Sequence, residues 1–133
     1  MRSASGNLKR VTLELGGNDP AIVLPDVDIE DVAPKLFWAA FQNSAQFCVA
    51  TKRLYIHARI YDELSAELVR YASTIRVGDG SLASSDLGPL QNRMQYEKVQ
   101  SLIDATRQAG PPLLARWGKG RAARLFCSCN PCR

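Results

Sequence analysis

The sequence predicts an α/β domain in which a largely parallel sheet is flanked by helices. Short apolar runs bounded by turn residues alternate with longer segments that have helical periodicity. The expected order is strand, strand, helix, strand, helix, loop, helix, and there are no internal repeats. A chain of 133 residues is long enough for one hydrophobic core.

Three strands are expected in the first half of the chain. Residues 10–17, RVTLELGG, alternate apolar and polar side chains before they reach a glycine pair. Residues 20–28, PAIVLPDVD, form a short apolar run bounded by prolines, which is typical of a buried strand. Residues 52–58, KRLYIHA, place Leu54 and Ile56 on one face of a third strand.

Three helices are expected between and after these strands. Residues 29–42 follow Asp28, which can cap the helix, and they carry acidic side chains in the first turn. Residues 60–78 form the clearest amphipathic helix, with apolar residues at near-helical spacing: Ile60, Leu64, Leu68 and Tyr71. Residues 93–110 form another helix, which Gly110 and two prolines end. A turn-rich loop joins the last two helices.

Composition and charge exclude several classes of function. The chain is 46% hydrophobic and 23% charged, as in an ordinary globular domain. Its net charge of +4 is modest and interspersed, which argues against nucleic-acid binding. It has no stretch that could span a bilayer, and its amino terminus lacks the apolar middle of a signal peptide. A cytoplasmic protein without nucleic-acid or membrane partners is therefore expected.

The last residues differ in composition from the rest. Residues 111–133 are basic and contain no acidic side chain, so we expect a tail that is poorly ordered or unrelated to the domain of residues 1–110. Three cysteines gather there: Cys127, Cys129 and Cys132. A closed zinc site needs a fourth ligand, and the single histidine, His57, lies far upstream. We therefore assign no metal, although a small metal-binding tail remains an alternative.

One cysteine and one glutamate have surroundings that suggest chemistry. Cys48 lies in a loop of small and polar residues, FQNSAQFCVATKR, and Lys52 or Arg53 would increase the thiolate fraction. Glu14 is expected at a strand end, where α/β sheets deliver groups to a ligand crevice. From the residues alone, a single cysteine is more often a small buried hydrophobe, and a strand-end glutamate is more often a solvated charge. Both interpretations stay open at this point.

Other features of the sequence carry less chemistry. The glycines form neither G-x-G-x-x-G nor G-x-x-x-x-G-K-[ST], so no phosphate-binding loop is recognisable. Phe37, Trp38 and Phe41, on the helix before Cys48, are interpreted as core residues.

Several segments together resemble the catalytic domain of the NAD(P)-dependent aldehyde dehydrogenase superfamily. The segments are VTLELGG, FQNSAQFCVATKR, YDEL and VGDG…LGPLQNRMQYEKV, and the resemblance covers about residues 7 to 110. The family's L-E-L-G-G signature matches residues 13–17. Its Q-N-x-G-Q-x-C-x-A-x-x-R signature is matched by Gln42, Asn43, Gln46, Cys48, Ala50 and Arg53. The glutamate and the cysteine are 48 − 14 = 34 positions apart, about the family's interval.

The resemblance implies oxidation of an aldehyde to a carboxylic acid, with NAD or NADP as hydride acceptor. Cys48 would be the nucleophile that forms a thiohemiacetal and then a thioester, and its own backbone N–H would be one oxyanion donor. Glu14 would be the general base that activates water. The residues that match cofactor contacts are Leu15 and Gly16, near the nicotinamide, and Gln95 and Lys98, on the ribose side. For Lys98 a solvated helix charge is an equally good interpretation.

The chain departs from the family pattern at several places. Ala45 replaces a glycine, which should cost little unless the backbone needs a positive φ. The dinucleotide-binding domain, the asparagine oxyanion donor and the E-x-F-G-P segment are not in this sequence. We therefore expect a partial catalytic domain that is nearly inactive alone, from a family whose full-length members can be homo-oligomers. The alternative is a non-enzymatic fragment or interaction module. The sequence decides neither the aldehyde nor the choice between NAD and NADP.

Overall fold

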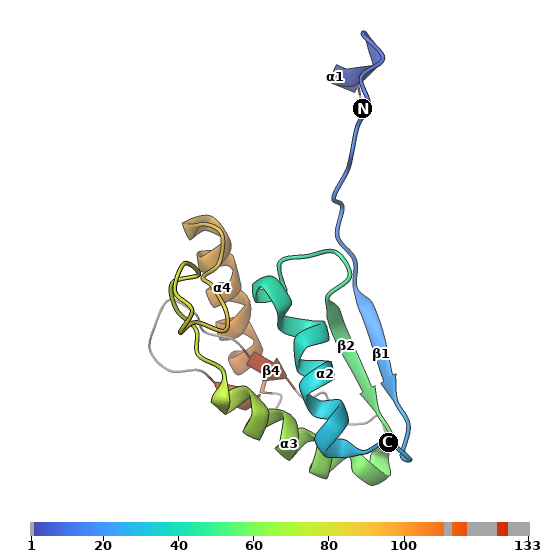
Figure 1. The fold of residues 1–133 in the computed structure, drawn as a ribbon, viewed down its shortest axis with the longest axis vertical. Coiled ribbons are helices and arrows are strands. Elements are labelled where there is room, and N and C mark those ends of the chain that lie inside the picture. The colour runs from blue at the N-terminus through green and yellow to red at the C-terminus, as the bar shows by residue number, and fades with distance from the viewer. Residues whose placement is uncertain (1, 111–112, 117–124, 128–133) are drawn as a thin grey trace.

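The computed structural model describes residues 2–110, 113–116 and 125–127. Its body consists of two parallel strands and three long helices (Figure 1). In chain order these are β1 (Asp19–Val23), α2 (Ile29–Phe41), β2 (Thr51–Ile56), α3 (Tyr61–Thr74) and α4 (Arg93–Ala109). The short elements are α1 (Arg2–Ser5), the 3₁₀ turns η1 (Gln42–Ala45) and η2 (Ala58–Ile60), β3 (Leu113–Arg116) and β4 (Leu125–Cys127).

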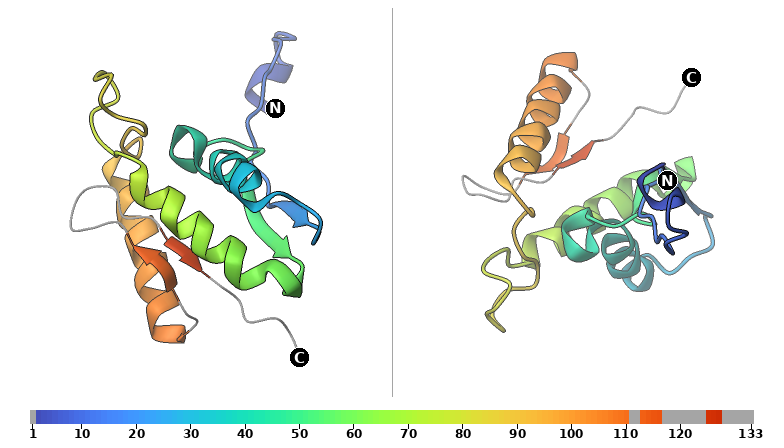
Figure 2. Two further views of the ribbon diagram at one scale, coloured as in Figure 1. Left: turned by 60° about the horizontal axis from the view of Figure 1, so that its bottom comes forward. Right: turned by 90° about the horizontal axis from the view of Figure 1, so that it is seen from above.

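The strands β1 and β2 are joined through α2 in a βαβ arrangement. They pair in parallel from Asp19 opposite Thr51 to Val23 opposite Ile56. A parallel pair needs a crossover connection, and α2 supplies it. This helix packs against β2 and also against α3 (Figures 1 and 2). The predicted α/β class, with a parallel sheet and flanking helices, is confirmed.

The core lies where α2 and α3 meet the strands. Phe37 and Leu64 are the largest fully buried side chains. The ring of Phe37 contacts those of Trp38, Phe41 and Tyr71, with centroids 5.0 to 5.4 Å apart. Trp38 donates its indole N–H to the Tyr71 hydroxyl over 2.9 Å, which satisfies both polar atoms in this apolar setting. The aromatic residues before Cys48 are therefore core residues, as predicted.

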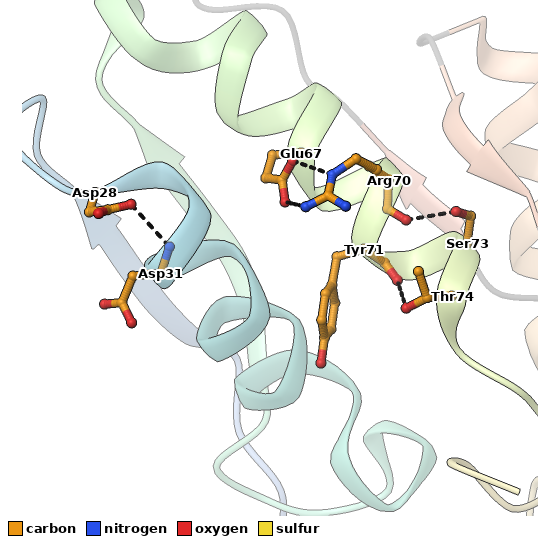
Figure 3. A network of polar contacts seen from close by, with 7 residues as sticks. All are labelled: Asp28, Asp31, Glu67, Arg70, Tyr71, Ser73 and Thr74. Atoms are coloured by element: carbon orange, nitrogen blue, oxygen red, sulfur yellow. Dashed lines mark hydrogen bonds and ion pairs between the residues drawn. The ribbon is translucent and has the colours of Figure 1, made fainter. Parts of the chain in front are cut away.

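Local signals fix the helix ends. The Asp28 carboxylate accepts a hydrogen bond from the Asp31 amide over 3.1 Å and caps α2 (Figure 3). Gly110 ends α4 in the left-handed conformation, with φ of 83°.

An ion pair lies along α3. The Arg70 guanidinium binds the carboxylate of Glu67 one turn earlier, and this hydrogen bond lowers the pKa of Glu67 (Figure 3).

The prediction of a strand at residues 10–17 is wrong. Residues 9–18 form neither strand nor helix, and they lead away from the body as an extended segment (Figure 1). A strand needs a neighbour for its backbone hydrogen bonds, and no described residue pairs with this segment. The side chains of Val11, Leu13 and Leu15 are correspondingly exposed. Glu14 thus precedes the first strand of the sheet and does not end one.

One face of the β1–β2 pair is uncovered. Ile22 and Tyr55 lie opposite each other in the register, and their side chains are 74% and 52% exposed. Parallel sheets in globular proteins usually have both faces covered. The described residues therefore supply a helical layer for one face of this sheet only.

The carboxy-terminal tail is described only in part. The strands β3 and β4 pair antiparallel within it, and the rest of residues 111–133 lies outside the described residues, including Cys129 and Cys132. His57 follows β2, where its ring nitrogen Nδ1 accepts the Arg59 amide over 3.2 Å. Among the described residues, no group of three possible metal ligands comes together. No described helix is long and apolar enough to cross a membrane.

Candidate active site

The loop that carries Cys48 begins with three residues in left-handed backbone conformations. Asn43, Ser44 and Ala45 have φ values of 48°, 60° and 60°. They reverse the chain after α2, so that Cys48 lies in the turn that leads into β2. Non-glycine residues adopt this conformation at a cost, because Cβ approaches the carbonyl oxygen. Replacement of the family's glycine by Ala45 was expected to cost little unless the backbone needs a positive φ. This position does have a positive φ, so the replacement carries a cost.

The segment before α4 holds the loop in place. The Ser44 hydroxyl is buried and donates a hydrogen bond to the Gly88 carbonyl over 2.6 Å. The side-chain carbonyl of Gln46 accepts the Gln91 amide over 2.8 Å. These bonds join residues far apart in sequence, and they place the first turn of α4 next to the cysteine loop.

The Lys52 side chain binds the backbone of the turn that contains Cys48, which precedes it in the sequence. Its ammonium donates to the carbonyl oxygens of Phe47, Cys48 and Ala50 over 3.3, 3.3 and 2.9 Å. The Ala50 amide also closes the turn by donating to the Phe47 carbonyl over 3.3 Å. The sequence suggested a cation near the thiol, and the structure shows that Lys52 contacts the turn's backbone.

Arg53 connects the cysteine-bearing strand to the glutamate-bearing segment. Its Nε and Nη2 atoms both donate to the Asn18 carbonyl, over 3.0 and 2.8 Å. Its Nη1 atom donates to the Tyr55 hydroxyl over 3.1 Å, and the guanidinium lies 5.8 Å from the centroid of that ring. Arg53 therefore contacts the residue that precedes β1 and a residue of its own strand, β2.

The glutamate segment passes against the cysteine turn at Gly17. A Cβ atom on Gly17 would lie 3.1 Å from the Cys48 carbonyl oxygen and 2.5 Å from a carboxylate oxygen of Asp19. A side chain at this position would crowd the Cys48 carbonyl oxygen, and glycine avoids that crowding. The segments of Glu14 and Cys48 both precede their parallel strands and meet at the same end of the sheet (Figure 1). This corrects the expectation of a carboxyl-end crevice, because the meeting point is the amino end.

The side chains of Glu14 and Cys48 are both accessible to solvent. Glu14 is exposed, and it forms no ion pair or hydrogen bond with another described residue. The Cys48 thiol is free and partly exposed. Within the described ranges, the Cys48 backbone N–H donates to no protein acceptor. A free thiol, an exposed carboxylate and a backbone N–H without a described acceptor thus occur on two segments that meet at Gly17.

Comparison with known proteins decides the family. A family model described as aldehyde dehydrogenase family matches residues 1–124. A probable aldehyde dehydrogenase from a Pseudomonas species is 53% identical over 113 residues, which cover 85% of this chain and 23% of that relative. The D-glyceraldehyde dehydrogenase (NADP(+)) of Picrophilus torridus is 40% identical over 114 residues, covering 86% of this chain and 23% of that protein. This chain belongs to the aldehyde dehydrogenase family.

Solved aldehyde dehydrogenases share the fold. A mutant of aldehyde dehydrogenase C from Pseudomonas syringae, solved with NAD+ and octanal, aligns with a TM-score of 0.77 and 34% identity over 95% of this chain and 27% of that one. Succinate-semialdehyde dehydrogenase from Burkholderia pseudomallei aligns with a TM-score of 0.76 and 33% identity, over 92% of this chain and 26% of its own. The present chain spans about a quarter of the length of the aldehyde dehydrogenases it matches.

The residues that match cofactor contacts of aldehyde dehydrogenases lie on two segments. Leu15 and Gly16 are exposed beside Glu14, and Gly16 has φ of 78° with no heavy atom within 4 Å of its Cβ position. Gln95 and Lys98 are exposed on the first two turns of α4. The exposed backbone at Gly16 and the side chains of Gln95 and Lys98, which bond no other described residue, could contact the nicotinamide and ribose half of a dinucleotide. The described residues include no glycine-rich loop for its phosphates.

Sequence reasoning missed several residues that hold this site. The Ser44 and Gly88 pair gives no signal, because a serine in a polar loop usually faces water. The acceptor that Arg53 finds at Asn18 is a backbone carbonyl, which no pattern of side chains reveals. The adjacent cations Lys52 and Arg53 after the cysteine were the one visible hint.

Proposed function

We propose that the activity this chain serves is oxidation of an aldehyde to a carboxylic acid with NAD or NADP as hydride acceptor, and that the chain alone is nearly inactive in this reaction. In this proposal Cys48 is the nucleophile and Glu14 is the general base. The supporting observation is the contact of the two signature segments, in which Gly17 approaches the Cys48 carbonyl and Arg53 binds Asn18. Membership of the aldehyde dehydrogenase family supports the same chemistry.

The first half of the reaction makes a bond to sulfur. The Cys48 thiolate attacks the aldehyde carbon, a carbon–sulfur bond forms, and the carbonyl oxygen becomes an oxyanion. The Cys48 N–H, which has no acceptor among the described residues, is available to stabilise that charge. A nicotinamide cofactor, when bound, supplies the acceptor for the hydride that leaves this carbon. The product on the protein is a thioester.

The second half of the reaction breaks that bond with water. The Glu14 carboxylate takes a proton from a water molecule whose oxygen attacks the thioester carbon. The carbon–sulfur bond breaks, the carboxylic acid leaves, and the Cys48 thiolate is regenerated. An exposed carboxylate without an ion-pair partner suits this role, because water and the acyl group can both reach it.

Cofactor contacts form the second part of the proposal. The backbone of Leu15 and Gly16 would lie along the nicotinamide, and Gln95 and Lys98 would bind the ribose. The relatives named above act on different aldehydes by their names, including D-glyceraldehyde and succinate semialdehyde. For this protein the proposal extends to the aldehyde group and not to a particular substrate.

Labelling with an electrophile that mimics an aldehyde tests the nucleophile. Methyl vinyl ketone is added at neutral pH, and labelled peptides are quantified by mass spectrometry. Cys48 is expected to react faster than the three tail cysteines Cys127, Cys129 and Cys132 in the same molecule. Equal or slower labelling of Cys48 would show that it is not an activated nucleophile.

The uncovered sheet face favours a second candidate function, an interaction module. Ile22 and Tyr55 form an apolar pair on a face that parallel sheets usually cover. In this alternative the face binds the apolar surface of another polypeptide and no catalysis occurs. Light scattering before and after Tyr55→Lys tests it: association that the lysine abolishes would support the module, and a monomer with a cooperative melt would contradict it.

A further inference from the structure

Lys52 and Arg53 are adjacent in sequence, but they bind the two reactive segments separately. We propose that both are positioning residues: Lys52 orients the Cys48 turn and its N–H donor, and Arg53 fixes the backbone that carries Glu14. This inference rests on the proposed function. Neither side chain forms an ion pair with a carboxylate of the described residues, so both cations are committed to backbone and hydroxyl oxygens.

The strand geometry explains why neighbours reach different segments. Successive side chains of a strand point to opposite faces. Because Lys52 and Arg53 are consecutive in β2, they leave it on opposite sides. Lys52 turns back to the loop that precedes β2, and Arg53 reaches across to the residue before β1.

Lys52 determines the direction of the open N–H donor. The Phe47 carbonyl and the Cys48 N–H belong to one trans peptide unit, in which C=O and N–H point in opposite directions. The ammonium of Lys52 binds the Phe47 carbonyl over 3.3 Å, so the Cys48 N–H points away from it. The bonds to the Cys48 and Ala50 carbonyls use the remaining donors of the ammonium and fix the turn.

Arg53 determines where the glutamate segment lies. Two of its nitrogens hold one carbonyl oxygen, that of Asn18, four residues after Glu14. A third nitrogen binds the Tyr55 hydroxyl, which orients the planar guanidinium. The bound carbonyl is next to Gly17, the residue in contact with Cys48. Loss of Arg53 would release this segment while leaving the cysteine turn intact.

The two roles predict different kinetic signatures in an acyl-transfer assay. The Cys48 thiolate attacks p-nitrophenyl acetate, the carbon–sulfur bond forms, and p-nitrophenolate leaves. Water activated by Glu14 then cleaves the acetyl–sulfur bond and releases acetate. Both steps pass through an oxyanion at the Cys48 N–H, whereas only the second needs the base. The assay uses the full chain with Cys127, Cys129 and Cys132 replaced by serine.

Lys52→Met is expected to slow both steps by about tenfold, because the oxyanion donor loses its orientation. Arg53→Met is expected to slow only deacylation, again by about tenfold, because the base is displaced. Arg53→Lys should not rescue deacylation, since an ammonium cannot reproduce the planar fork. Lys35→Met and Arg59→Met, which alter exposed cations elsewhere, are the matched controls and should change neither step.

Several outcomes would overturn the proposal. If Arg53→Met behaves like Arg59→Met while Glu14→Gln slows deacylation, Arg53 does not position the base. If Lys52→Met leaves acylation unchanged, Lys52 does not orient the donor. If Cys48 of the unmodified chain acetylates no faster than a tail thiol, the proposed function itself fails.

Amide hydrogen exchange tests the positioning without any chemistry at sulfur. Arg53→Met should accelerate exchange in β1, whose backbone pairs with β2, and leave unchanged the Ala50 amide, which donates to the Phe47 carbonyl. Lys52→Met should do the reverse. Unchanged exchange in both variants would contradict the inference even in a chain that shows no acyl transfer.

Discussion

Gly17 approaches the backbone of Cys48 so closely that a Cβ atom on Gly17 would lie 3.1 Å from the Cys48 carbonyl oxygen. This contact joins a segment of ten residues without regular structure to the turn before β2. Gly17 is the second glycine of the L-E-L-G-G signature, and a methyl group there would crowd this contact.

Gly17→Ala is expected to separate the two segments. The added Cβ would force a shift of a few tenths of an ångström against a backbone oxygen, while the Asp19 carboxylate can swing aside. Because small displacements of catalytic groups cost rate, deacylation of acetylated Cys48 should slow by about three- to tenfold. Gly6→Ala is the control, since nothing lies within 4 Å of its Cβ position. An unchanged rate in Gly17→Ala would show that the contact does not set the site.

Ala45→Gly is expected to stabilise the fold. Ala45 has φ of 60°, where an alanine is strained and a glycine is not, so the free energy of unfolding should rise by about 1 kcal/mol. The same substitution at Ala39, inside α2, should instead lower it by about 1 kcal/mol. Urea titrations of both variants measure the two changes. A loss of stability in Ala45→Gly would mean that the loop does not hold this conformation.

Ser44→Ala is expected to loosen the cysteine loop. The Ser44 hydroxyl is 4% exposed and donates to the Gly88 carbonyl, so its loss leaves that acceptor unpaired at a cost of about 1–2 kcal/mol. Ser73→Ala removes an exposed hydroxyl that bonds within its own helix, and it should be close to neutral. Thermal unfolding compares the two. If both variants lower the melting temperature equally, the Ser44 hydrogen bond does not hold the cysteine loop on the segment before α4.

The pair of Arg76 and Asp86 gives a pH-dependent prediction. Hydrogen bonds from the Arg76 guanidinium, and then from its backbone amide, lower the pKa of Asp86 from 3.8 to about 2. A depressed carboxylate pKa means that the stabilisation is present above about pH 4 and is lost as the pH falls toward 2. Asp86→Asn should therefore lose less stability than the unmodified chain between pH 5 and pH 2. Urea titrations at the two pH values measure the free energy of unfolding of both chains. An equal decrease in the variant and in the unmodified chain would contradict this prediction.

The sequence was sufficient for elements whose signals are local. The β1, β2, α2 and α3 elements follow from apolar periodicity, and Asp28 and Gly110 mark helix ends by their own chemistry. The strand at residues 10–17 was wrong because alternation shows which face would be buried but not whether a partner strand is there.

The site was predictable only as a pair of residues. The spacing of Glu14 and Cys48, with the family signatures, indicated the chemistry. The left-handed backbone at Ala45 and the bonds from Arg53 to Asn18 depend on contacts between segments, which no local pattern encodes. The structure therefore adds the backbone contacts that bring the two segments together.

The lifetime of the acetyl group on Cys48 tests most directly whether this thiol and the Glu14 carboxylate act on one acyl group. The unmodified chain and its Glu14→Gln variant are each mixed with p-nitrophenyl acetate, and the acetylated Cys48 peptide is followed over time by mass spectrometry. We predict that both chains acquire the acetyl group at similar rates and that only the unmodified chain loses it quickly. Loss of the acetyl group at the same rate in both chains would contradict the shared site.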